Sequence, residues 1–251
     1  MSFANKVILV TGASSGIGAS TAILFAKEGA NVVMVGRDQT KLKTVSDKCA
    51  QVGKKPLVII ADISKDDDAR RIVKETIDKF GKLDVLVNNA GLNKPGSILD
   101  GKVLESYDKT FSVNVRAVIH LTSLAAPHLI KTKGNIVNVS GVISVTTPHF
   151  PDWISYHVSK AALDHFTRGA AKELAPSGVR VNAVSPGPVI TDFAKNIGLD
   201  IKFENFTHLT ALNRISQPEE IADMIEYLAG EKAVGITGSI FVVDCGALVK
   251  Q

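Results

Sequence analysis

Short apolar runs alternate with helical patterns along almost the whole chain. The runs are rich in Val and Ile and lack a regular polar alternation, which is typical of parallel strands buried on both faces. We therefore predict about seven strands, at Lys6–Val10, Asn31–Val35, Leu57–Ala61, Val85–Asn88, Asn135–Val139, Arg180–Ser185 and Ser239–Val243. Helical patterns lie between them, including Ile17–Glu28, Asp66–Lys79, Tyr156–Leu174 and Pro218–Leu228. Repeated strand–helix–strand units predict right-handed crossovers and an α/β fold, a doubly wound parallel sheet with helices on both faces.

Two of the helical patterns are preceded by an S/T-x-x-D/E capping signal. Ser64 with Asp67 would cap one helix, and Ser216 with Glu219 would cap the other. The chain has no linker, low-complexity tract or second domain boundary. Residues 1–251 are therefore expected to form one domain.

Composition and charge narrow the class of protein. With 251 residues, 45% hydrophobic and 22% charged, the chain is typical of a globular protein. The net charge is +4, without a long Lys/Arg run, so a nucleic-acid partner is not predicted. Cys49 and Cys245 lie far apart and outside any Cys/His cluster, which disfavours a disulfide framework or a metal site. The apolar runs are too short for a signal peptide or a membrane span, so we expect a cytoplasmic protein.

The first predicted strand runs directly into a glycine-rich loop and then a helix. The glycines would let backbone N–H groups approach a pyrophosphate, and the helix would present its positive N-terminus to that anion. The spacing is Gly-x-x-x-Gly-x-Gly, which differs from the usual Rossmann Gly-x-Gly-x-x-Gly. The loop residues predicted to bind a dinucleotide are Gly12, Ser14, Ser15, Gly16, Ile17 and Gly18.

The end of the second strand bears on the choice of dinucleotide. Gly36 and Arg37 follow the strand, and a guanidinium can pair bidentately with a 2′-phosphate, so we favour NADP(H) over NAD(H). Asp38 argues for NAD(H), because it lies about 20 residues beyond the glycine loop, where an acidic residue usually binds the ribose. Its other interpretation is the N-cap of the next helix.

Two further strand ends carry polar or small residues suited to a ligand crevice. Asp62, followed by Ile63, would accept from the adenine amino group, or else would cap a loop. Asn89, Ala90 and Gly91 follow the fourth strand, where the alternative is an amide-rich turn.

Five motifs, in order, resemble those of the short-chain dehydrogenase/reductase (SDR) family. They are TGASSGIG, NNAG, Asn114 within SVNVRA, YHVSK and SPGPVIT, and the resemblance extends from Lys6 to Gly246. It implies a Rossmann-type sheet and an oxidoreductase that uses a nicotinamide dinucleotide.

The resemblance also assigns catalytic roles. Tyr156 would be the general acid/base at the carbinol oxygen, and Lys160, one helical turn away, would favour the phenolate and bind the nicotinamide ribose. Asn114 resembles the asparagine that holds a relay water, although alone it would suggest a helix-interior amide. Pro186, Gly187, Val189 and Thr191 resemble the segment that fixes the nicotinamide carboxamide, with a proline-rich structural loop as the alternative.

The sequence departs from the family at the catalytic serine. Aligning from the fifth strand puts Gly141 at that place, and counting back from the tyrosine gives Ile143; neither has a hydroxyl. The intervening loop is longer than is usual in the family. Adjacent strand residues point to opposite faces, which displaces Ser140 by one position from the ideal direction, whereas Ser144 would reach the site if the longer loop bulges. We expect Ser140 to serve, with Ser144 and the absence of any serine as alternatives.

The expected substrate is a hydrophobic alcohol or carbonyl compound, such as a steroid, retinoid, terpenoid or acyl chain. Candidate lining residues are Val142, Thr146, Phe150, Trp153, Phe193, Phe203 and Phe206. The alternative for several of these aromatic residues is that they anchor loops to the core. Ala161, Ala162, Ala170 and Ala171 would allow close helix pairing, and with the family resemblance they suggest a homotetramer.

The hypothesis is an NADP(H)-dependent carbonyl reductase or alcohol dehydrogenase. A non-catalytic dinucleotide sensor or scaffold is the alternative, supported only by the missing serine at 141. A structural subunit of a larger assembly is a weaker third possibility.

Overall fold

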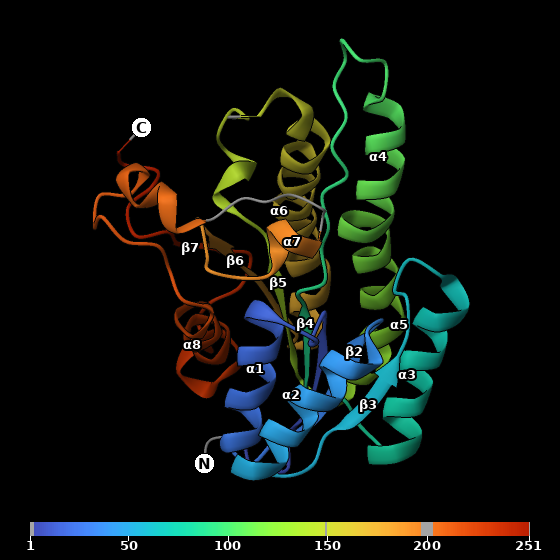
Figure 1. Cartoon of the computed structure of the whole chain (residues 1–251). Coiled ribbons are helices and arrows are strands. Elements are labelled where there is room, and N and C mark those ends of the chain that lie inside the picture. The colour runs from blue at the N-terminus through green and yellow to red at the C-terminus, as the bar shows by residue number, and fades with distance from the viewer. Residues whose placement is uncertain (1–2, 149, 197–202, 251) are drawn as a thin grey trace.

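The computed structural model describes residues 3–148, 150–196 and 203–250. Its seven strands pair in parallel in the order β3-β2-β1-β4-β5-β6-β7 (Figure 1). They are β1 (Val7–Thr11), β2 (Asn31–Gly36), β3 (Leu57–Ile60), β4 (Val85–Asn88), β5 (Asn135–Val139), β6 (Arg180–Pro186) and β7 (Ile240–Val243). The order reverses between β1 and β4, which confirms the predicted doubly wound sheet.

Helices cover both faces of this sheet (Figure 1). One face packs on α1 (Gly16–Lys27), α2 (Gln39–Val52) and α8 (Pro218–Ala229), and the other on α3 (Asp66–Phe80), α5 (Ala117–Thr132) and α6 (Ile154–Leu174). In addition, α4 (Val103–Phe111) packs against α6, and α7 (Phe193–Asn196) is a short helix after β6.

Burial on both faces explains the continuous apolar runs. In β1, Val7 and Leu9 join the core beneath α3 and α5, whereas Ile8 and Val10 join the core beneath α1 and α8. All four side chains are almost completely inaccessible to solvent. Because successive strand residues point to opposite faces, a strand covered on both sides has no polar face to show in the sequence.

Both capping predictions were wrong in detail. The N-cap of α3 is Lys65, and Ser64 instead donates to the Asp62 carboxylate. At α8 the capping interaction lies one residue later than predicted, because the Gln217 backbone N–H donates to Glu220 Oε2 at 2.7 Å. Pro218 at the first helical position fixes this start, since proline favours the N1 site.

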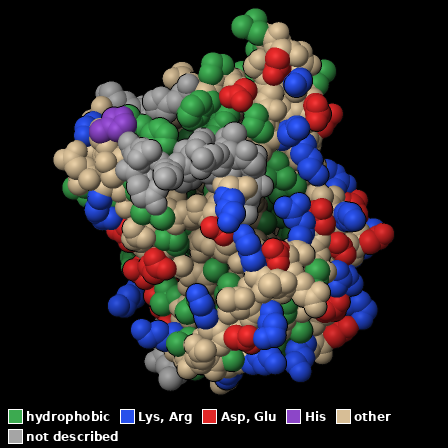
Figure 2. Space-filling model, viewed as in Figure 1, with side chains coloured by type: hydrophobic (Ala, Val, Ile, Leu, Met, Phe, Trp, Pro, Cys, Tyr) green, Lys and Arg blue, Asp and Glu red, His purple; other side chains and the backbone are tan. Residues whose placement is uncertain are grey.

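The proposed pairing face of α6 also needs correction. Ala170 and Ala171 pack inside the chain's own core, whereas Ala161 is exposed and Ala162 is half-buried. On the face shown in Figure 2, Lys and Arg side chains are interspersed with Asp and Glu.

Within the described ranges, no helix combines the length and apolar character needed to cross a membrane.

Candidate active site

A cavity of about 1070 Å³ opens beside the carboxyl ends of the strands, where the strand order reverses. Open α/β sheets bind ligands at this place, because loops from neighbouring strands diverge there. Its wall is formed by the glycine loop, Arg37, Asp62, the loop after β4, Tyr156, Lys160 and the segment after β6. Of the predicted cofactor-binding residues, only Gly18 lies off the wall.

The glycine loop is shaped for close approach to a ligand. Gly12 and Gly16 have φ values of +66° and +54°, in the left-handed region that favours glycine. A Cβ at Gly16 would lie 2.9 Å from Thr191 Cγ2, so any side chain there would fill the cradle. At Gly18 a Cβ would collide with the Gly12 carbonyl and the Asn89 amide. These three positions fit a loop that receives a pyrophosphate. The N-terminus of α1, which follows the loop, favours the same anion.

Thr11, at the end of β1, fastens this loop to the loop after β4. Its hydroxyl accepts from the backbone N–H of Asn89 at 3.0 Å and of Ala90 at 3.1 Å. In turn, Asn89 Nδ2 donates to the Thr11 carbonyl at 2.9 Å. The predicted Asn89–Gly91 segment is thereby held against the glycine loop.

Asp38, Asp62 and Lys41, which line the cavity together with Arg37, make different contacts. The Asp38 carboxylate accepts from the Lys41 backbone N–H at 2.9 Å and caps α2, which was its alternative interpretation. Asp62 accepts from the Ser64 backbone and hydroxyl at 3.0 and 2.7 Å. Burial acts to raise the pKa of Asp62, but the Ser64 hydrogen bonds and the Arg37 charge together hold that pKa below its ordinary value. Lys41 Nζ pairs with Asp192 at 3.0 Å.

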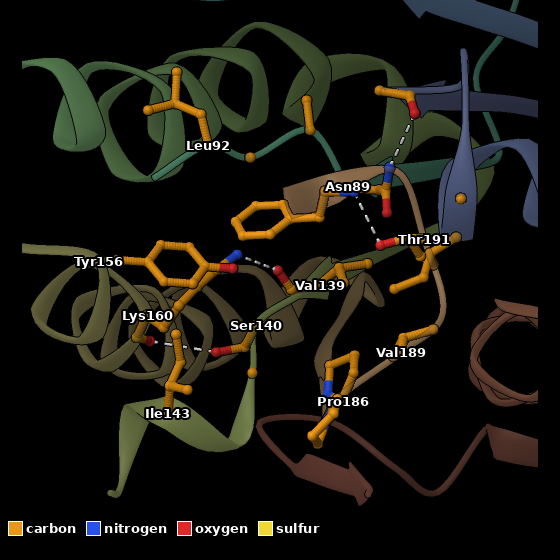
Figure 3. A pocket seen from close by; sticks show the side chains of 18 of the residues that line it. Asn89, Leu92, Val139, Ser140, Ile143, Tyr156, Lys160, Pro186, Val189 and Thr191 are labelled. Carbon is orange, nitrogen blue, oxygen red and sulfur yellow. Dashed lines mark hydrogen bonds between the residues drawn. The ribbon is translucent and has the colours of Figure 1, made fainter. Parts of the chain in front are cut away.

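Helix α6 carries Tyr156 and Lys160 one turn apart on the cavity wall (Figure 3). Lys160 is buried, and its Nζ donates to the Val139 carbonyl at 2.8 Å and lies 5.8 Å from the Tyr156 ring centroid. Burial lowers the pKa of Lys160 to about 8, because the ammonium loses hydration, while the Asp164 charge partly opposes the change. Burial also raises the pKa of Tyr156, which favours the neutral phenol.

Asn114 lies off the cavity wall, within a π-helical turn at Ser112–Arg116. Its Nδ2 donates to the Leu92 carbonyl at 2.9 Å and to Ser159 Oγ at 3.0 Å, and its Oδ1 accepts from the Leu92 N–H at 2.9 Å. A Cβ at Gly91 would lie 3.4 Å from Asn114 Oδ1 and 3.6 Å from Lys160 Nζ. Asn114 therefore joins the loop after β4 to the helix that carries Lys160.

The structure separates the two candidate serines. Ser140 is on the wall, but its hydroxyl turns toward α6 and donates to the Lys160 carbonyl at 3.3 Å (Figure 3). Asn138, two residues earlier, likewise bonds Thr167 of α6, as strand alternation requires. Ser144 does not line the cavity, whereas Gly141 and Ile143 do.

The segment after β6 closes the opposite wall with Pro186, Gly187, Val189 and Thr191. A Cβ at Gly187 would lie 2.7 Å from Asp244 Cβ, which explains why this position is a glycine. Val189 bridges to Ser216, and Thr191 Oγ1 accepts from the Phe193 N–H at 3.3 Å.

Aromatic side chains surround Tyr156. The Phe193 ring stacks on it with centroids 5.5 Å apart, and the Trp153 ring meets it edge-on at 6.1 Å. Phe150 packs against Trp153 at 5.2 Å. Val142, Thr146 and Phe206 also line the cavity as predicted, whereas the side chain of Phe203 lies outside the described part of the chain.

Several wall residues were missed by the sequence analysis. They are Leu92, Val113, His157, His208, Leu209, Ala247 and Lys250. His157 follows Tyr156 directly and was therefore accessible to prediction. The residues from 208 onward come from segments distant in sequence, and no local pattern marks them.

Comparisons with known proteins agree with this geometry. Residues 12–247 match the family described as enoyl-(acyl carrier protein) reductase. The chain belongs to the short-chain dehydrogenase/reductase family. This SDR is 33% identical over 250 residues to 3-oxoacyl-(acyl-carrier-protein) reductase FabG of Thermotoga maritima, covering 99% of this chain and 100% of that relative. It is 39% identical over 249 residues to glucose 1-dehydrogenase of Gluconobacter oxydans, covering 97% and 92%.

Solved SDR structures have the same fold. A short-chain dehydrogenase/reductase of unknown function from Caenorhabditis elegans, determined with cofactor, has a TM-score of 0.93 and 38% identity over 99% of this chain and 97% of that one. A short-chain dehydrogenase from Burkholderia cenocepacia in complex with NADP has a TM-score of 0.91 and 32% identity, covering 99% and 100%. This SDR is thus an NAD(P)-dependent oxidoreductase.

Proposed function

We propose that this SDR interconverts a ketone or aldehyde and the corresponding alcohol on a hydrophobic small molecule, with NADP(H) as its preferred cofactor. The observation that supports this most directly is that Tyr156, Lys160 and the glycine loop line the same cavity. In this proposal the substrate carbonyl lies beside Tyr156, among Trp153, Phe193 and Ile143.

The residues of the chain have distinct tasks in a reduction. A bound dinucleotide supplies the hydride. Tyr156 begins as the neutral phenol, which its burial favours, and gives its proton to the substrate oxygen. The Lys160 ammonium stabilises the phenolate that remains. Asn114 holds the loop after β4 against α6, and Ser140 fastens the end of β5 to the same helix. A relay water near Asn114 and Lys160 would return the proton.

The preference for NADP(H) is supported by the surroundings of Arg37. Arg37 lines the cavity at the end of β2, where a ribose 2′-phosphate would lie, and Lys41 lines it as well. The competing acidic residue, Asp38, accepts from the Lys41 backbone as a helix cap. The Burkholderia cenocepacia neighbour was determined with NADP, which points the same way.

The hydrophobic substrate is supported by the aromatic and aliphatic wall around Tyr156. Among the classes expected, an acyl-type compound has additional support, because the Thermotoga maritima relative is named as a reductase of 3-oxoacyl groups. The relative named glucose 1-dehydrogenase indicates that related chains also act on polar alcohols. A panel should therefore include both kinds of compound.

The test is NADPH oxidation with a panel of apolar and polar carbonyl compounds, using the wild type and Tyr156→Phe. Turnover in the wild type should fall by about 10³-fold or more in the variant, since it keeps the ring and loses the transferable proton. NADPH affinity, measured by fluorescence titration, should change less than about threefold. Retained turnover in Tyr156→Phe would refute the mechanism.

The alternative is a non-catalytic dinucleotide sensor, and the absence of a hydroxyl at Gly141 is the observation that favours it. The same assay distinguishes a carbonyl reductase from a dinucleotide sensor. A wild-type protein that binds NADPH tightly but reduces no member of the panel would support the sensor.

We also infer that the protein assembles as a homotetramer or homodimer through α6. Val158 on the outer face of this helix is 49% exposed, and Ala161 beside it is exposed too. An apolar side chain next to a small residue allows two helices to approach closely.

A further inference from the structure

We propose that Gly141 determines substrate specificity, because it withholds the hydroxyl that the end of β5 would otherwise present beside Tyr156. The site then favours carbonyl groups activated by a neighbouring electron-withdrawing group, such as an α-diketone, over isolated ketones. This inference rests on the proposed function and extends it to the chemical class of the substrate.

Neither the backbone nor the available space requires glycine at this position. Gly141 has φ 173° and ψ 149°, an extended conformation that any residue adopts. A Cβ there would lie 3.3 Å from Ile143 Cγ1 and 3.7 Å from the Pro186 carbonyl oxygen. A shift of a few tenths of an ångström by the half-buried Ile143 side chain would accommodate a Cβ. The position is therefore not restricted to glycine by its backbone or by the space for a Cβ.

Two polar side chains of the cavity wall, those of Ser140 and His157, have other partners. The Ser140 hydroxyl donates to the Lys160 carbonyl, which lies away from the cavity along α6 (Figure 3). His157 Nδ1 lies 3.1 Å from the Trp153 carbonyl, which can only accept, so Nδ1 donates there. Ile143, labelled in Figure 3 beside Ser140, places an aliphatic side chain on this part of the wall.

Because of the chemistry of hydride addition, the missing hydroxyl affects some carbonyl substrates more than others. In a reduction, the carbonyl carbon would accept a hydride from the reduced nicotinamide while the C=O π bond breaks and its electron pair moves to oxygen. That oxygen would take the Tyr156 proton, which leaves an alcohol, a tyrosinate and the oxidised dinucleotide. A donor aimed at this oxygen is worth roughly 10²–10³ in rate. A neighbouring electron-withdrawing group spreads the developing charge, so an activated carbonyl depends less on such a donor.

The experiment compares an aryl α-diketone with the aryl monoketone of the same carbon skeleton. In Gly141→Ser, kcat/KM for the monoketone should rise by about 10- to 100-fold, within the range of one added donor. For the diketone it should rise less than about threefold, so the selectivity ratio falls. Gly141→Ala is the matched control, because it adds the Cβ without the hydroxyl and should leave the ratio unchanged.

Binding measurements separate this effect from a change of fit. Trp153 is the one tryptophan of the chain and lines the cavity, so its fluorescence reports ketone binding without turnover. The dissociation constant of the monoketone should change less than about threefold in Gly141→Ser, since the new donor acts mainly in the transition state. If Ile143 holds the serine in an unproductive rotamer, Gly141→Ser with Ile143→Ala should show the gain, with Ile143→Ala alone as its control.

Three results would overturn the inference. The first is equal selectivity in Gly141→Ser and Gly141→Ala, with and without the Ile143 substitution. The second is a roughly hundredfold loss of turnover in Ser140→Ala or Thr146→Val, which would identify one of those hydroxyls as the donor. The third is a wild type that reduces the monoketone as well as the diketone. A wild type that reduces no carbonyl at all would instead contradict the proposed function.

Discussion

Lys160 links catalysis to pH through its burial. Its ammonium group is held against the Val139 carbonyl, and burial lowers its pKa from 10.5 to about 8. Tyr156 is a better proton donor while that neighbouring charge is present, because the charge stabilises the phenolate it leaves behind. The rate of ketone reduction should therefore depend on the protonated form of Lys160.

We predict that kcat/KM for reduction is level below pH 8 and falls as the pH rises through about 8.

The lowered pKa of Lys160 also predicts how the stability of the fold depends on pH. Between about 8 and 10.5 the unfolded chain binds more protons at this lysine than the folded chain, so the free energy of unfolding should rise with pH in this window. Urea titrations across the window would measure the rise, and Lys160→Met should remove this contribution. A fall in stability that disappears in Lys160→Met would contradict the assignment.

Arg37 is the residue on which the cofactor preference depends. We predict that Arg37→Ala raises the dissociation constant of NADPH by about tenfold or more, since a charge-assisted pair with a phosphate is lost. The dissociation constant of NADH should change less than about threefold. Fluorescence titration with both dinucleotides measures this ratio, and Lys43→Ala is the control, because Lys43 is exposed and pairs with Asp47 away from the cavity. Equal losses for NADPH and NADH would refute the preference.

Single residues were predictable from sequence where they belong to a motif. Tyr156, Lys160 and most of the glycine loop line one cavity. The orientation of Ser140 could not be fixed, because it depends on which face of β5 meets α6. The loop between Ser140 and Tyr156 has no periodic pattern, so its turn at Val142–Ser144 is known only from the structure.

Among the elements, the junction of β1, its glycine loop and α1 has little tolerance for added atoms. A Cβ at Gly18 would meet the Gly12 carbonyl and the Asn89 amide, which belong to the loops after β1 and β4. The π-helical turn around Asn114 is a second specialised element, and such turns are frequent at functional sites. Its bonds to Leu92 are long-range, so the sequence could indicate the asparagine but not the turn.

We predict that Gly18→Ala lowers the free energy of unfolding by about 1–3 kcal/mol, because overpacking against backbone atoms forces a shift of the loop. It should also weaken NADPH binding by about tenfold or more, through the displaced pyrophosphate cradle. Gly235→Ala is the matched control, since its added Cβ would meet nothing within 4 Å. Chemical denaturation and NADPH titration measure both effects. Wild-type stability and affinity in Gly18→Ala would show that this contact relaxes without cost.

At the scale of the whole molecule, the sheet order brings segments distant in the sequence to one cavity. The strand pattern predicted this sheet because burial on both faces leaves uninterrupted apolar runs. The cavity wall contributed by His208, Ala247 and Lys250 could not be predicted in the same way, because it depends on how the last segments of the chain return to the sheet. Assembly is likewise a property of a surface rather than of a motif.

We predict that Val158→Asp reduces the oligomer to a smaller species, because two buried charges would face each other across a two-fold axis. Size-exclusion chromatography with light scattering measures the mass, and circular dichroism checks that the fold persists. Val52→Asp is the control, since Val52 is 45% exposed at the end of α2. An unchanged mass in Val158→Asp would exclude this face of α6 as the interface.

The central claim is that hydride reaches a substrate carbonyl beside Tyr156. The most direct measurement uses NADPH deuterated at both C4 positions and an α-diketone, with mass spectrometry of the hydroxyketone product. The account predicts one deuterium at the new carbinol carbon with the wild type and no product above background with Tyr156→Phe. Product without deuterium, or equal deuterium incorporation by Tyr156→Phe, would contradict it.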